Sequence, residues 1–240
     1  MKLLAFETAT EACSVALYLD GEVRECFEVA PRRHAELALP WAQALLAEAG
    51  IARAQLDAVA VGRGPGAFTG VRLAIALAQG IALALDRPVV PVSTLAVLAS
   101  GAPADGPARI LAAIDARMGE VYTGAFLRHG GTLAAIDAER VRAPDAVALP
   151  AGHEGDWQGV GTGFAAAAGV LGERLGASLE RIDATALPRA SALARLAAIA
   201  FAGGHALAPE RVEPAYLRDN VALTLVEQQA LRDARKAGCG

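Results

Sequence analysis

Short apolar runs separated by turn residues open the chain and predict strands. Lys2–Glu7 is mainly apolar, as a buried strand requires, and Ala12–Leu19 is rich in residues that favour strands. Asp20-Gly21 is a strong hairpin signal, and it leads into Glu22–Val29, where charged and apolar positions alternate imperfectly. We therefore predict three antiparallel strands at the start of the chain.

Helical periodicity alternates with strand-like runs over the next seventy residues. The expected elements are a helix over His34–Ala49, a strand over Ala58–Val61, a helix over Ala67–Leu85, a strand over Val89–Val92 and a helix from the N-cap Ser93 to Ser100. Pro40 lies inside the first of these helices, where it should produce a kink or mark the true start.

The strand pattern then repeats after the linker-like stretch Gly101–Pro107. The expected elements are strands over Ile110–Ile114, Val121–Leu127, Leu133–Ala138 and Trp157–Val160, and helices over Gly163–Leu175 and Ala190–Ala202. The repeat predicts an α/β, two-lobed fold built from a duplicated mixed-sheet unit, as in actin-like, or ASKHA (ribonuclease H-like), proteins.

The repeat also sets the expected domain organisation. We expect an N-terminal lobe over residues 1–102, a reduced C-terminal lobe over residues 108–222 and a charged tail over residues 223–240. The helix over residues 190–202 is expected to pack back on the first lobe.

Composition narrows the function classes. Of 240 residues, 54% are hydrophobic and 20% are charged, and the net charge is −4 without any basic cluster. A dedicated nucleic-acid surface needs clustered Lys and Arg, so no such surface is expected. No signal peptide is evident, and the most apolar helix is short and interrupted by Arg72 and Gln79, so we expect a cytoplasmic protein without a membrane segment. Cys13, Cys26 and Cys239 are expected to be free thiols.

The predicted helix over Ala67–Leu85 is apolar on two opposite sides. At 100° per residue, one stripe suits packing on a sheet and comprises Gly70, Ala74, Leu77, Ile81 and Leu85. The opposite side has few polar residues, which predicts that a partner covers it, although the other lobe is the alternative cover. Together with a stripe on the preceding helix, the predicted partner interface comprises Leu37, Trp41, Leu45, Phe68, Arg72, Ile75, Gln79 and Leu83.

The sequence contains few candidates for catalytic, anion-binding or metal-binding residues. The glycine-rich segment Gly62–Arg72 either places a helix N-terminus near an anion or is a tight strand-to-helix turn packed on another backbone. Residues that match vestigial phosphate or nucleotide loops, with ordinary hairpin chemistry as the alternative, are Thr8, Thr10, Asp115, Gly161 and Gly163. The four histidines have no metal-binding spacing and no nucleophile has a neighbouring base, so we predict neither catalytic residues nor a metal site.

Five segments, in order along nearly the whole chain, resemble the TsaB family. They are Glu7-Thr-Ala-Thr-Glu-Ala-Cys-Ser-Val-Ala16, Gly62-Arg-Gly-Pro-Gly-Ala-Phe-Thr-Gly-Val-Arg72, Val92-Ser-Thr-Leu95, Ile114-Asp-Ala-Arg-Met-Gly-Glu-Val-Tyr122 and Glu213-Pro-Ala-Tyr-Leu-Arg-Asp-Asn-Val-Ala222. The resemblance implies an actin-like fold and a cytoplasmic complex with TsaD and TsaE that adds threonylcarbamoyl to the adenosine beside the anticodon. It also implies that the first-lobe helices bind TsaD, that the same face forms a homodimer when the chain is alone, and that tRNA is reached only through the complex.

The resemblance further implies a non-catalytic subunit. TsaD-like enzymes carry a metal-binding His-x-x-x-His at a place where this chain has Thr94 and Leu98. No cofactor is expected, and a nucleotide at the junction with TsaD is left open. Two alternatives remain: a metal-dependent, glycoprotease-like peptidase, which the missing histidine pair opposes, and a small ATP-binding kinase of the same fold, for which Asp115 is the only candidate acid.

Overall fold

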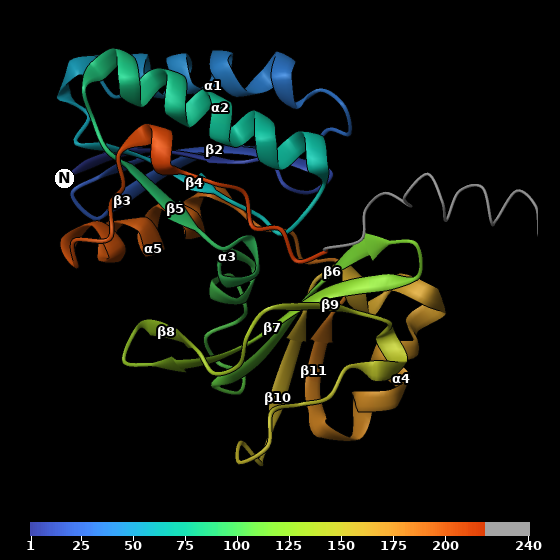
Figure 1. Cartoon of the computed structure of the whole chain (residues 1–240). Helices are drawn as coiled ribbons and strands as arrows, with labels where there is room; N and C mark the ends of the chain where they lie inside the picture. The colour runs from blue at the N-terminus through green and yellow to red at the C-terminus, as the bar shows by residue number, and fades with distance from the viewer. Residues whose placement is uncertain (219–240) are drawn as a thin grey trace, which may run out of the picture.

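The computed structural model describes residues 1–218, and these residues form two α/β lobes stacked on one another (Figure 1). The predicted charged tail over residues 223–240, the last residues of the predicted second lobe and Cys239 lie outside the described residues.

A five-stranded mixed sheet forms the first lobe. Its strands are β1 (Lys2–Glu7), β2 (Ala12–Leu19), β3 (Glu22–Val29), β4 (Ala58–Gly62) and β5 (Val89–Val92). Their order is β3-β2-β1-β4-β5, with the first three antiparallel and β1, β4 and β5 parallel. The predicted opening hairpins are therefore confirmed.

Both faces of this sheet are covered, because its strands are apolar on both sides. Leu4 and Phe6 point toward α1 (His34–Glu48) and α2 (Phe68–Leu85), whereas Leu3 belongs to the core on the opposite face. Pro40 lies inside α1, so it does not mark the start of this helix.

The second sheet repeats the topology of the first. Its strands are β6 (Arg109–Arg117), β7 (Glu120–His129), β8 (Thr132–Ala135), β9 (Arg140–Arg142), β10 (Trp157–Val160) and β11 (Leu179–Asp183). The order β8-β7-β6-β10-β11 matches β3-β2-β1-β4-β5, and the parallel and antiparallel pairs correspond. The predicted duplication of a mixed-sheet unit is confirmed, although β9 and β11 were not predicted.

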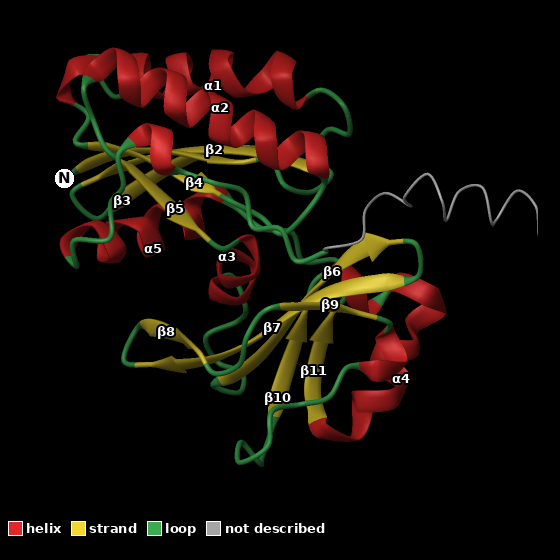
Figure 2. Cartoon of the chain, in the orientation of Figure 1, coloured by secondary structure: helices red, strands yellow, loops and turns green. Residues whose placement is uncertain are grey.

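Helix α3 (Thr94–Ser100) lies between the two sheets (Figure 2). Ser93 caps it as predicted, because its hydroxyl accepts hydrogen bonds from the amides of Leu95 and Ala96. Leu95 and Leu98 join a core cluster with strands of the second sheet. The first lobe is thus connected to the second through a buried apolar contact as well as through the chain.

Short, irregular elements cover the face of the second sheet that lies opposite α3. The predicted helix over Gly163–Leu175 is wrong for its first half, because only α4 (Val170–Leu175) is α-helical. Ala167 and Ala168 have φ of 48° and 58°, and Gly169 has φ of 84°, so the backbone leaves the right-handed helical region there. Gly169 marks this break in the sequence, whereas the four alanines before it favour a helix.

Helix α5 (Ala190–Ala202) comes from the end of the second half but packs on β1 and β2 of the first sheet. Polar groups of the first sheet fix its N-terminus. The Ser14 hydroxyl accepts the amide of Ala190 at 2.8 Å, and the Glu25 carboxylate accepts the amide of Ser191 at 2.9 Å. A carboxylate at this end of a helix also interacts favourably with the helix dipole.

The last described segment, residues 209–218, forms a strap that joins the lobes (Figure 1). Val212 is buried in the first-lobe core, and the amide of Ala215 donates to the carbonyl oxygen of Arg63 at 2.8 Å. Arg218 then donates to the carbonyl oxygen of Ala116 at 3.2 Å in the second lobe. The strap therefore contacts both lobes within a few residues.

Candidate functional site

The inner side of α2 is a stripe of mainly small side chains packed on the first sheet. The buried residues of the helix are Gly70, Val71, Ala74, Ile75, Ala78 and Ala82. The larger residues predicted to face the sheet, Leu77, Ile81 and Leu85, are only partly buried beside this stripe. The small residues let the helix approach the sheet closely, which rotates it relative to the predicted orientation.

Two predicted interface positions therefore face inward instead. Ile75 is 5% exposed and Leu45 of α1 is 3% exposed, so the prediction that they lie on an outer face is wrong. Leu37 and Trp41 are partly buried and pack against the same core. Both helices carry apolar residues on almost every side, so periodicity alone could not fix their rotation.

Two further predicted interface residues of α2 contact the strap of the same chain. The Gln79 side-chain amide donates to the carbonyl oxygens of Pro209 at 2.8 Å and Val212 at 3.3 Å. Arg72 donates to the Tyr216 hydroxyl, and its guanidinium lies 3.3 Å from the centroid of the Phe68 ring. One flank of the helix is therefore covered by its own chain.

The remaining side of α2 is exposed and apolar. Phe68 and Leu83 are 64% and 62% exposed, and Leu39 on the neighbouring α1 is 41% exposed. Between Phe68 and Leu83, Ala76 and Gly80 are exposed too. Arg72 is the only charged residue of the helix. An exposed apolar face of this kind is typical of a docking surface, and we call these five residues, Leu39, Phe68, Ala76, Gly80 and Leu83, the outer face.

A hollow lies beside the outer face, between α1, α2, β1 and the segment that precedes β4. Its volume is about 70 Å³, and it is lined mainly by apolar side chains, among them Leu39, Leu46 and Ile81. Gln43 and Arg53 supply the polar part of its lining. Its shape and chemistry suit an apolar side chain presented by another protein.

By length and composition alone, α2 is also long and apolar enough to cross a membrane, with a mean hydropathy of 1.7. Packing on the sheet accounts for the apolar character of its inner side. The apolar character of the outer face has no such explanation within residues 1–218.

Glu7, at the end of β1, is the centre of a buried polar cluster. It is 1% exposed. Its carboxylate accepts hydrogen bonds from the amide of Ala9 at 2.9 Å and from the hydroxyl of Thr94 at 3.1 Å. Burial raises the pKa of Glu7 to about 7, and these hydrogen bonds only partly oppose that effect. The first hairpin is thereby tied to the N-terminus of α3.

The glycine-rich turn packs directly on this hairpin. A Cβ at Gly62 would lie 2.0 Å from the Glu7 carboxylate, and one at Gly70 would lie 2.0 Å from the carbonyl oxygen of Thr8. Glycine is therefore required at both positions by close backbone approach. Of the two interpretations of this segment, the tight strand-to-helix turn agrees with the structure.

The first predicted phosphate loop has its polar groups engaged within the chain. Thr8 is fully buried, and its hydroxyl donates to the carbonyl oxygen of Gly70 at 2.7 Å. The carbonyl oxygen of Thr10 accepts a hydrogen bond from Nε2 of His34 at 2.9 Å. With the Ala9 amide held by Glu7, the prediction of an anion loop at Thr8 and Thr10 is replaced by the hairpin alternative.

The corresponding loops of the second lobe are also closed. Asp115 accepts from the amide and guanidinium of Arg117, both at 2.8 Å. A Cβ at Gly161 would lie 2.2 Å from the carbonyl oxygen of Ala113, and Gly163 packs against the same residue. Both glycines are therefore in tight contact with β6.

The two positions matched to metal-binding histidines serve structural roles. The Thr94 hydroxyl links Glu7 to the amide of Gly64, which donates to it at 3.2 Å. Leu98 is 2% exposed in the core between the lobes. Within residues 1–218, no group of three or more His, Cys, Asp or Glu side chains is arranged to hold a metal ion.

A match to a known family gives the class of this protein. The sequence model of the family described as "TsaD: tRNA N6-adenosine threonylcarbamoyltransferase" matches residues 28–225. Together with the duplicated sheets, this match confirms the predicted actin-like fold.

Closer relatives specify the family. The chain is 45% identical over 230 residues to "tRNA threonylcarbamoyladenosine biosynthesis protein TsaB" of Escherichia coli, covering 92% of this chain and 96% of that protein. It is 37% identical to the Haemophilus influenzae protein of the same name, with 92% and 95% coverage. The solved structure of "YeaZ from Pseudomonas aeruginosa" is similar, with TM-score 0.81, 45% identity and coverage of 90% of this chain and 100% of that one. The chain belongs to the TsaB family.

Proposed function

We propose that this chain takes part in the biosynthesis of threonylcarbamoyladenosine in tRNA, as a non-catalytic subunit that binds a TsaD-type transferase. The names of its relatives support the process. The observation that carries the binding role is the outer face, where Phe68 and Leu83 are more than half exposed on a helix with a single charge. Removing such an apolar face from water favours association with a second protein.

The geometry of the outer face favours a helix as the contacting element. Ala76 and Gly80 are one turn apart, and small side chains at this spacing let a second helix approach closely. Phe68 and Leu83 lie toward the two ends of the same helix, where they can contact the partner on either side. The neighbouring apolar hollow can accept one further side chain. A stable pair of this kind commonly buries about 800 Å² on each partner.

The non-catalytic role is supported by the polar clusters. Thr94 and Leu98 are committed to the interior, and Glu7 is enclosed by the glycine-rich turn. Asp115, the acid that a kinase of this fold would need, is paired with Arg117. In this proposal a TsaD-type subunit and TsaE supply the chemistry in the cytoplasm, tRNA is held by the complex, and the outer face forms a homodimer when the partner is absent.

Replacing Leu83 by Glu tests the outer face. Leu83→Glu places a carboxylate within the proposed contact without entering the core, because Leu83 is 62% exposed. We expect loss of co-purification with the TsaD-type subunit and unchanged thermal unfolding of the free chain. Ile75→Glu is unsuitable, since Ile75 is buried and its substitution would destabilise the fold itself.

Ile199→Glu is the matched control. Ile199 is an aliphatic residue, 52% exposed on α5, which covers the opposite face of the same sheet. The Ile199→Glu variant should still co-purify with the TsaD-type subunit. Equal retention of the partner by both variants would show that α2 is not the contact, and equal loss would show that a general surface effect is responsible.

A further inference from the structure

Large exposed side chains continue beyond the outer face, along one side of the molecule. Phe68, at the start of α2, lies against Arg72, which donates to the hydroxyl of Tyr216 in the strap. Tyr216 is 58% exposed. Two residues further on, Nη1 of Arg218 donates to Sδ of Met118 at 3.8 Å. These contacts lead from the first lobe, across the end of the strap, to the hairpin of β6 and β7 in the second lobe (Figure 1).

Met118 lies at the tip of this hairpin. At 87%, it is the most exposed large apolar residue among residues 1–218. Arg117, Met118 and Gly119 have φ of 63°, 56° and 77°, so three residues in a row are left-handed. Asparagine and glycine adopt this conformation more readily than methionine does. Neither packing nor local backbone geometry therefore accounts for an apolar side chain at this position.

Hydrogen bonds from two sides hold the hairpin tip in place. The Asp115 carboxylate accepts the amide and the guanidinium of Arg117 from within the hairpin. Arg218, at the end of the strap, donates to the Glu120 carboxylate. The backbone that carries Met118 is therefore ordered before any partner binds, which lowers the entropic cost of association.

The charges along this side of the molecule are balanced except at one residue. The arginines of the hairpin and of the strap end are each paired with a carboxylate of the same hairpin. Arg72, in contrast, donates only to neutral oxygens within residues 1–218, namely the Phe68 carbonyl oxygen at 3.4 Å and the Tyr216 hydroxyl. A protein that covers Arg72 is therefore favoured if it brings a carboxylate to this guanidinium.

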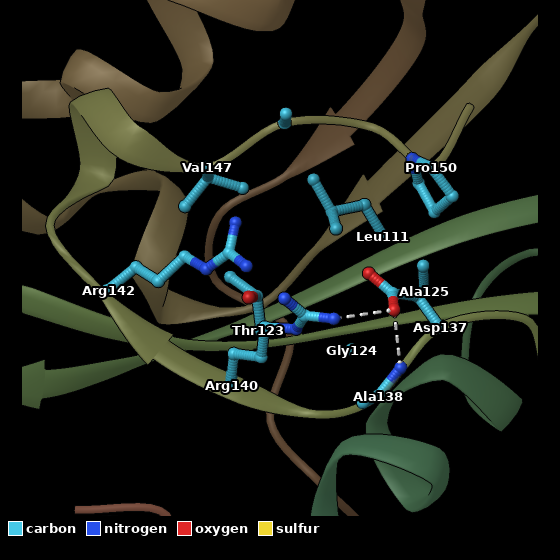
Figure 3. A pocket seen from close by; sticks show the side chains of 11 residues that line it. Leu111, Thr123, Gly124, Ala125, Asp137, Ala138, Arg140, Arg142, Val147 and Pro150 are labelled. Carbon is cyan, nitrogen blue, oxygen red and sulfur yellow. Dashed lines mark hydrogen bonds and ion pairs between the residues drawn. The ribbon is translucent and has the colours of Figure 1, made fainter.

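A hollow beside β9 offers no alternative contact on the second lobe. Its lining includes Thr123 and Arg140, and the Arg140 guanidinium is bound to Asp137 (Figure 3). Its volume is about 20 Å³, which is room for about one water molecule. A side chain of another protein does not fit there, whereas Met118 can itself enter a depression on a partner.

We propose that the TsaD-type subunit that covers the outer face also contacts the second lobe through Met118. The partner presents an apolar depression to this side chain, whose flexible thioether adapts to irregular surfaces, and a carboxylate to Arg72. The inference rests on the proposed function, because it assigns further contacts to the same partner. Its consequence is that the partner contacts both lobes and fixes their relative orientation.

Met118→Asn tests the hairpin contact without endangering the fold, because asparagine tolerates a left-handed backbone. The dissociation constant of the purified TsaD-type subunit, measured by titration calorimetry, should rise by about fivefold to tenfold, as loss of an apolar anchor does. Thermal unfolding of the free variant should be unchanged or shifted upward. Ile182→Asn is the control, since Ile182 is an exposed aliphatic residue on β11 of the same lobe, and it should bind the partner like the wild type.

Arg72→Gln tests the carboxylate contact. Binding should weaken and should also depend less on sodium chloride concentration than in the wild type, because an ion pair has been removed. An unchanged dependence on salt would contradict the contact.

Leu83→Glu separates this inference from the proposed function. If Leu83→Glu abolishes binding while Met118→Asn binds like the wild type, the contact with the second lobe is refuted and the outer face stands. If Met118→Asn and Leu83→Glu both bind like the wild type, the proposed function fails as well. Weaker binding in both variants, with Ile182→Asn unaffected, supports one partner surface that spans the two lobes.

Discussion

Replacing Glu7 by Gln tests whether this buried carboxyl is protonated in the folded protein near neutral pH. Burial raises the pKa of Glu7 from its ordinary value of 4.5 to about 7. The folded state then binds the proton more tightly than the unfolded state does. The resulting stabilisation is fully present below pH 4.5 and is lost as the pH rises through 7.

The magnitude follows from these two pKa values. At 1.36 kcal/mol per pKa unit, the interval from 4.5 to about 7 corresponds to about 3.4 kcal/mol. About 2.5 kcal/mol of this is lost between pH 5 and pH 8. Glu7→Gln has no such dependence, because the amide is uncharged at every pH and its oxygen can still accept the amide of Ala9.

Urea unfolding of both proteins at pH 5, 6, 7 and 8 measures the effect. We expect the stability of Glu7→Gln, relative to the wild type, to increase by about 2.5 kcal/mol from pH 5 to pH 8. Other titrating groups cancel in this difference. In the control Glu36→Gln, the pKa of the exposed carboxyl is lowered by Arg33, so any small trend should have the opposite sign. A difference between wild type and Glu7→Gln that is independent of pH would refute the argument.

Three further predictions concern packing. Gly70→Ala should lower the free energy of unfolding by at least about 2 kcal/mol, because the new Cβ would lie 2.0 Å from the Thr8 carbonyl oxygen. Gly80→Ala on the same helix should raise it by about 0.5–1 kcal/mol, because its Cβ meets nothing within 4 Å. Thermal unfolding of the two variants measures the difference. Gln79→Ala should cost about 1–3 kcal/mol and increase proteolytic cleavage in the strap, and unchanged cleavage would contradict the anchoring role. The thiol of Cys13 is buried and its pKa is raised to about 12, so iodoacetamide should label it only after unfolding, as mass spectrometry can show.

The duplicated architecture was predictable from the sequence because its strands are marked clearly. Apolar runs such as Lys2–Glu7 and turn signals such as Asp20-Gly21 determine local structure directly. The cap at Ser93 was predictable for the same reason. The position of the strap could not be predicted, because it depends on distant partners such as Gln79 and Arg63 rather than on periodicity.

The orientation of the helices could not be predicted, and this changed the candidate site. In α2, Ile75 and Leu83 are equally apolar by residue type, yet one is 5% exposed and the other 62%. What separates them is the row of small residues that contacts the sheet, and a sequence gives no means of knowing how closely a helix approaches. The existence of an apolar outer surface was predictable, but its residues were not.

The position of α5 has a consequence for synthesis on the ribosome. One side of the first sheet, including Leu3 and Ala5, stays uncovered until residues 190–202 have been translated. About a hundred residues separate the end of the first sheet, at Val92, from the start of α5, and at about 5–20 residues per second their synthesis takes roughly 5–20 s. During that interval the nascent chain presents an incomplete hydrophobic sheet to solvent. Fragments that end near residue 102 should therefore aggregate, and chaperones that bind nascent chains have a defined interval in which to act.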